Sequence, residues 1–66
     1  MTIREIAGVY NDFMAQVIRV YKNGGFVVCN YGYKLAQEMT DKEWHDFMDT
    51  KFSFFEANGV AIHFYI

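Results

Sequence analysis

The last 16 residues of the chain constrain its fold more than any other stretch. They are two runs rich in aromatic and β-branched residues, one on each side of the pair Asn58-Gly59. An Asn-Gly pair between such runs is the strongest short signal for a β-hairpin, because both residues tolerate the positive φ of a type I′ turn. We therefore predict a C-terminal hairpin with Asn58 and Gly59 as its loop.

This loop fixes which side chains face one another across the predicted hairpin, and large apolar groups then fall on both of its faces. A hairpin with one solvated face should alternate apolar and polar residues. Both faces therefore need cover, and a chain of 66 residues has little material to spare. A second copy of the chain is the simplest cover, so we predict a homo-oligomer. The predicted pairs are Phe55 with Ile62 and Ser53 with Phe64 on one face, and Phe54 with His63 and Phe52 with Tyr65 on the other; the predicted interface residues are Phe52, Phe54, His63, Phe64, Tyr65 and Ile66.

Chain length limits how the protein can be stabilised. Residues 1–66 make a single domain, which at this size buries only about 60% of its unfolded surface. Cys29 is the only cysteine, so no disulfide can form within the chain, and no cysteine and histidine cluster has zinc spacing. We expect no metal and no cofactor. The chain instead has seven Phe, five Tyr and one Trp, and each ring can bury about 150–250 Å².

Charge narrows the range of partners. The net charge is −2 and the pI is near 5.5, whereas proteins that bind duplex nucleic acid carry a clustered basic face. No apolar run approaches the roughly 20 residues of a membrane span, and the N-terminus lacks the layout of a signal peptide. An unpaired cysteine suits a reducing compartment. We expect a cytoplasmic protein with no duplex nucleic acid or membrane partner.

The N-terminal half begins with a helix signal. Thr2 and Glu5 have the spacing of a capping box, and the helical periodicity of the apolar residues predicts a helix to about Ala15. Gly8 costs about 1 kcal/mol inside a helix and indicates a close contact or a weaker helix. The periodicity continues to Tyr21, which leaves open one long helix to residue 22.

Residues 17–21 are too rich in β-branched and aromatic residues to be a good helix end. They precede a Lys-Asn-Gly-Gly turn and the run Phe-Val-Val-Cys, so we favour a second hairpin. Its register places Tyr21 opposite Phe26, Val20 opposite Val27, Arg19 opposite Val28 and Ile18 opposite Cys29. One face then carries Ile18, Val20, Val27, Cys29, Tyr31 and Tyr33, and the outer face carries Val17, Arg19, Tyr21, Phe26, Val28, Asn30 and Lys34.

A second capping box, Thr40 with Glu43, opens a short helix to about Asp49. Its buried stripe is Trp44, Phe47 and Met48. Gly32 is expected to bend or end the preceding strand, and residues 33–39 are ambiguous. The predicted order is α-β-β-α-β-β, an α+β fold with helices on one face of antiparallel hairpins. The alternative is α-β-α-β, with helices to residue 22 and from 41 to 57.

No pattern in the chain fixes a catalytic chemistry. His45 and Asp49 can touch at i, i+4, but no nucleophile or oxyanion hole accompanies them, so a solvated polar face is expected. Cys29, His45 and His63 are too scattered for a zinc site. The turn Lys22–Gly25 could cradle a phosphate, but it lacks the P-loop pattern. We predict that the protein is not an enzyme.

The chain is tiny, acidic, rich in aromatic residues and free of motifs. In this profile it resembles small phage-encoded proteins that block host defences, and the resemblance rests on the profile rather than on an aligned motif. Some of these proteins sequester nucleotide signals between identical subunits, and others, the anti-CRISPR proteins, cover a protein surface. The resemblance therefore implies a binding protein whose partner is a small nucleotide-like ligand or a host protein.

Rings flanked by cations can stack a base and hold its phosphate. The sequence thus favours a homo-oligomer that sequesters a nucleotide-like ligand, with a predicted ligand site at Arg19, Tyr21, Lys22, Phe26 and Lys34. One alternative is an acidic inhibitor that binds a basic protein. A structural subunit of a larger assembly is the third possibility. In the acidic inhibitor, the phosphate-mimicking residues would be Asp41, Glu43, Asp46 and Asp49.

Overall fold

The computed structural model describes all residues, Met1–Ile66, and has an α+β fold, as predicted. The elements follow the predicted order, with one short 3-10 helix and one α-helix added. The alternative α-β-α-β order is wrong, because both of its disputed segments contain strands. The elements are α1 (Ile3–Val9), the 3-10 helix η1 (Phe13–Ala15), β1 (Val17–Lys22), β2 (Gly25–Tyr31), α2 (Gly32–Glu38), α3 (Asp41–Met48), β3 (Phe54–Ala57) and β4 (Ala61–Tyr65).

The first helix is shorter than its periodicity indicates. It ends at Val9, because Tyr10 has extended dihedral angles (φ −103°, ψ 112°), and η1 then carries the chain to β1. Its capping box is present in part: the Thr2 backbone N–H donates to Glu5 Oε1 at 2.8 Å. The weak helix interior at Gly8 agrees with this early end.

The first hairpin turns at Asn23 and Gly24, whose φ values of 53° and 81° are those of a type I′ turn. The predicted pairing of Tyr21 with Phe26 is present, but the register then shifts by one at an irregularity between Val20 and Tyr21. Arg19 pairs with Cys29, Val20 with Val28 and Ile18 with Asn30. The predicted faces of residues 28–31 are therefore exchanged: Val28 packs on the core, whereas Cys29 and Tyr31 are exposed.

The second hairpin has the predicted faces but not the predicted register. Phe54 pairs with Tyr65 and Phe55 with Phe64, a shift of two residues from the expectation. The Asn58 side-chain oxygen accepts hydrogen bonds from the backbone N–H groups of Val60 (3.2 Å) and Ala61 (2.9 Å), which lengthens the loop. Because side chains alternate with period two, a shift of two residues leaves the side chains of β3 and β4 on their predicted faces, whereas Phe52, which precedes β3, packs toward the core instead.

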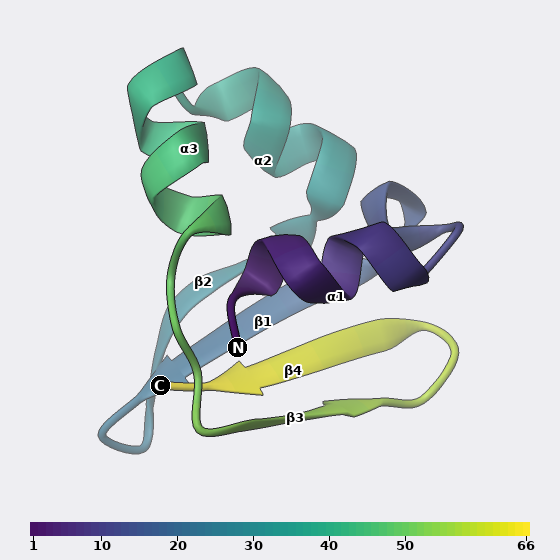
Figure 1. The fold of residues 1–66 in the computed structure, drawn as a ribbon, viewed down its shortest axis with the longest axis vertical. Helices are drawn as coiled ribbons and strands as arrows, with labels where there is room; N and C mark the ends of the chain where they lie inside the picture. The colour runs from purple at the N-terminus through teal and green to yellow at the C-terminus, as the bar shows by residue number, and fades with distance from the viewer.

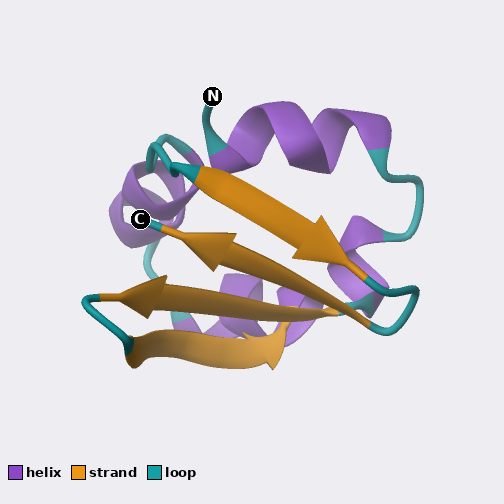
Figure 2. Ribbon diagram, turned by 90° about the horizontal axis from the view of Figure 1, so that it is seen from below, coloured by secondary structure: helices purple, strands orange, loops and turns teal.

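The two hairpins join into one sheet of order β2-β1-β4-β3, with β1 and β4 parallel at its centre (Figure 1). The helices lie to one side of the sheet, and Figure 2 shows the strands in front of them. The core lies between the two layers, and it holds side chains from both hairpins and all three α-helices. Its ten buried members are Ile3, Ile6, Phe13, Ile18, Val20, Leu35, Phe47, Met48, Ile62 and Phe64.

Residues 33–39, which the sequence leaves ambiguous, lie in α2. A Cβ added at Gly32, the first residue of this helix, would lie 2.8 Å from Met14 Cα, so only glycine allows η1 to approach so closely. The following helix α3 begins as predicted: Thr40 Oγ1 accepts from the Glu43 N–H at 3.2 Å, and Glu43 Oε1 accepts from the Thr40 N–H at 2.8 Å. The α3 side chains Phe47 and Met48 are buried.

Candidate functional site

The face of the sheet opposite the helices is not covered by any part of the chain, and we call it the open face (Figure 2). A row of aromatic rings crosses it, with one ring from each strand. Phe26 lies 5.0 Å from Tyr21, Tyr21 lies 4.8 Å from Tyr65, and Tyr65 lies 4.4 Å from Phe54, measured between ring centroids. These are the directly paired positions of neighbouring strands.

The rings in this row overlap one another. The planes of Tyr21 and Tyr65 differ by 9° and those of Tyr65 and Phe54 by 7°. Parallel rings so close cannot lie flat side by side on the sheet, so they form offset stacks that cover much of each other's faces. The two end rings are the most open, since Phe26 is 60% and Phe54 52% exposed. A planar ligand can therefore stack freely only at the ends of the row.

A second row crosses the open face beside the first and is formed by Cys29, Arg19, His63 and Glu56, again one residue from each strand. The Arg19 guanidinium carbon lies 5.4 Å from the centroid of the Phe26 ring, a cation–π geometry. The Tyr21 hydroxyl lies 2.9 Å from His63 Nδ1 and links the two rows. Partial burial raises the pKa of the Tyr65 phenol, and the nearby Glu56 carboxylate raises it further.

The structure brings three of the five predicted ligand residues together. Arg19, Tyr21 and Phe26 lie in contact on the open face. Lys22 is exposed at the end of β1 beside the turn. The placement of Lys34 on the outer strand face is wrong, because the chain leaves the sheet at Tyr31 and Lys34 lies in α2.

The predicted interface residues divide in a similar way. Phe54, His63 and Tyr65 lie on the open face, and Ile66 follows β4 with 38% of its surface exposed. Phe64 has no exposed surface, and Phe52 packs on it with ring centroids 5.0 Å apart. The prediction of Phe64 as a contact residue for a second copy is wrong, because it is buried in the core of one chain, whereas Phe52 is partly buried against that core.

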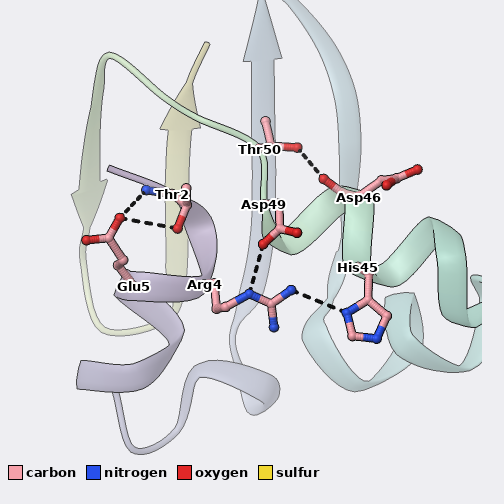
Figure 3. A network of polar contacts seen from close by, with 7 residues as sticks. All are labelled: Thr2, Arg4, Glu5, His45, Asp46, Asp49 and Thr50. Carbon is pink, nitrogen blue, oxygen red and sulfur yellow. Dashed lines mark hydrogen bonds and ion pairs between the residues drawn. The ribbon is translucent and has the colours of Figure 1, made fainter.

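The acidic side chains considered above are mostly engaged within the chain. Arg4 Nε donates to Asp49 Oδ1 at 2.9 Å, and an Arg4 terminal nitrogen lies 3.4 Å from His45 Nδ1, so Arg4 ties α1 to α3 (Figure 3). Lys42 pairs with Asp46 at 2.8 Å, and Glu43 caps α3. His45 and Asp49 thus both contact the side chain of Arg4, and these contacts hold α1 against α3. No group of three or more His, Cys, Asp or Glu side chains is placed to hold a metal ion.

Sequence reasoning missed two members of the open face. Glu56 was assigned no role, and because the predicted register pairs His63 with Phe54, only the observed shift of two residues sets Glu56 opposite His63. Cys29 was expected to face the core, and only the irregularity in the first hairpin turns it outward. The Asn-Gly pairs gave the hairpins, but no local signal showed that the hairpins adjoin and that their rings form one row.

The sequence matches no family model, and no curated protein or solved structure is significantly similar to it. None of the three α-helices has the length and apolar character that crossing a membrane requires.

Proposed function

We propose that this protein is a non-enzymatic binding protein that works as a homo-oligomer and sequesters a small nucleotide-like ligand, so as to block a host defence signal in the cytoplasm. The observation that carries the proposal is the open end of the ring row, where the Arg19 guanidinium lies over the exposed ring of Phe26. A ring beside a fixed cation can stack a base and attract its phosphate.

The shape of the single chain supports the homo-oligomer. The chain encloses no pocket, and the open face touches a ligand from one side only. Tight sites for small molecules bury most of the ligand surface in a concave cleft. A second copy would supply the missing wall beside Phe26, and Lys22 at the turn would add a cation at its edge.

The acidic inhibitor remains the alternative, with less support. A phosphate mimic needs free carboxylates, but Asp46 and Asp49 are paired with cations and Glu43 is held by the capping box. Of its four acids only Asp41 has no such engagement. The open face therefore offers the better binding surface.

Thermal shift measurements against a panel of nucleoside mono-, di- and cyclic phosphates test the ligand proposal, with native mass spectrometry to count subunits. We expect at least one nucleotide to raise the melting temperature and to be recovered intact. Phe26→Ala and Arg19→Gln should each weaken its binding about tenfold or more, the loss expected for one stacking or charge-assisted contact. Lys34→Gln removes the same charge as Arg19→Gln but from α2, and should leave binding unchanged.

A monomer whose melting temperature responds to no nucleotide would overturn the proposal. Equal losses in Arg19→Gln and Lys34→Gln would also overturn it, because the response would then follow net charge rather than the open face.

A further inference from the structure

The second row of the open face carries two opposite charges with His63 between them. Arg19 on β1 and Glu56 on β3 each pair with His63 on β4, so they lie one strand to either side of it. Two strand spacings separate their backbones by roughly 10 Å, and the two side chains form no ion pair within the chain. Glu56 is exposed, while Arg19 Nε is shielded from solvent and has no hydrogen-bond partner. Neither charge is therefore neutralised by a salt bridge within the chain.

We propose that two copies of this chain pack open face to open face about a two-fold axis that runs along β4. Arg19 of each copy then meets Glu56 of the partner subunit. This inference rests on the homo-oligomer of the proposed function and specifies the interface that forms it.

The charges select this axis among the possible ones. In a two-fold interface every contact occurs twice: if residue i of one copy contacts residue j of the partner, then residue j of the first copy contacts residue i of the partner. An axis along β1 would set Arg19 against its own copy, which is repulsive. An axis between β1 and β4 would set Arg19 against His63 of the partner subunit and leave Glu56 without a cation. Of these three axes, the one along β4 sets Arg19 against Glu56 twice.

The geometry of the ring row favours a second protein sheet over stacked nucleic acid bases as the partner that covers the open face. The rings already cover each other's faces, so an incoming base finds a free ring face only at Phe26 or Phe54. A flat sheet of the same kind can instead bury the outer edges of the whole row. The axis along β4 places Tyr65 near its own copy and Phe54 near Tyr21 of the partner subunit, so aromatic side chains meet aromatic side chains.

The same arrangement leaves β2 without a strand opposite it in the partner subunit. Rotation about the axis along β4 sets β1 against β3 of the partner, and no strand follows β3 that could lie against β2. Phe26 then stays at the rim, next to the β3 edge of the partner subunit. The ring of Phe26 and the surface predicted for the second copy are thus adjacent parts of one face, with Arg19 at the boundary between them. Three overlapping strands of about five residues cover roughly 250 Å² of flat sheet, so we expect a dimer that dissociates on dilution.

Sedimentation velocity over a concentration series, without ligand, tests this interface. The wild-type protein should approach twice the 7.8-kDa mass of the chain as its concentration rises. Glu56→Arg and Arg19→Glu should each raise the dimer dissociation constant about tenfold or more, because each puts like charges together twice. The double variant R19E/E56R should return to within about threefold of wild type. Lys34→Glu, the same charge reversal on α2, should dimerise as wild type does.

A wild type that stays monomeric at every concentration would overturn the inference, and so would a dimer that none of these variants weakens or a double variant that does not recover. Because Glu56 is exposed, Glu56→Arg tests the interface even if Arg19→Glu does not fold, and circular dichroism checks each fold. A monomer that still binds a nucleotide refutes this interface alone. A charge-dependent dimer that binds no nucleotide supports the interface and refutes the ligand proposal.

Discussion

Replacing Gly32 with alanine tests how closely α2 is packed against η1. The added Cβ would lie 2.8 Å from Met14 Cα and 3.0 Å from the Met14 carbonyl oxygen, and both are backbone atoms that cannot rotate away. Overpacking of this kind costs about 1–3 kcal/mol. Alanine is the better helix former, but Gly32 is the first residue of α2 and gains little from this preference. The clash should therefore dominate.

Gly8 provides the matched control. It also lies in a helix, and a Cβ there would meet no atom within 4 Å. Gly8→Ala should therefore stabilise the protein by about 0.5–1 kcal/mol, because alanine loses less backbone entropy on folding. The same chemical change is thus expected to have opposite signs at two helical positions of one chain.

Thermal unfolding followed by circular dichroism, at one fixed protein concentration, measures both effects. One kcal/mol shifts the melting temperature of a domain of this size by about 4–8 °C. Gly32→Ala should lower it by about 4–24 °C and Gly8→Ala should raise it by about 2–8 °C. A Gly32→Ala variant that melts at or above the wild-type temperature would refute the close approach of η1 to α2.

Three further outcomes follow from the core and from the start of α3. Phe64→Ala should lower the free energy of unfolding, measured by urea titration, by about 3–5 kcal/mol, which is enough to unfold much of a marginal domain. Phe54→Ala on the open face should lower it by less than about 1.5 kcal/mol in the monomer. Equal losses in the two variants would contradict the burial pattern. Thr40→Ala should lower the free energy of unfolding by about 1 kcal/mol, and an unchanged urea midpoint would argue against the cap. Backbone and side-chain hydrogen bonds from Thr40 lower the pKa of Glu43, so the ionised form stabilises the folded state at neutral pH and this contribution is lost as the pH falls through the folded-state pKa. Urea midpoints of wild type should therefore exceed those of Glu43→Gln at pH 7 and converge with them in acid, and a constant difference would contradict the linkage.

Part of the candidate site could be predicted from the sequence. The contact between Tyr21 and Phe26 follows from a two-residue turn at Asn23 and Gly24, because such a turn fixes the positions beside it. Lys34 was misplaced because Gly32 and the residues after it carry no decisive strand or helix signal. The contact between Tyr21 and Tyr65 could not be predicted, because it joins positions 44 residues apart on two different hairpins.

The sequence by itself determined the elements whose signals are local: two hairpins at Asn-Gly pairs, a capped helix at Thr40 and an α+β composition. Turn dihedral angles and helix caps depend on a few neighbouring residues, so a short stretch is sufficient to specify them. The tertiary structure alone decided that β1 and β4 lie parallel, that one residue of register is lost beside Val20, and that the open face carries an unbroken row of rings. These features arise when the apolar faces of both hairpins are buried against the same three helices, and burial of this kind is non-directional and has no short sequence code.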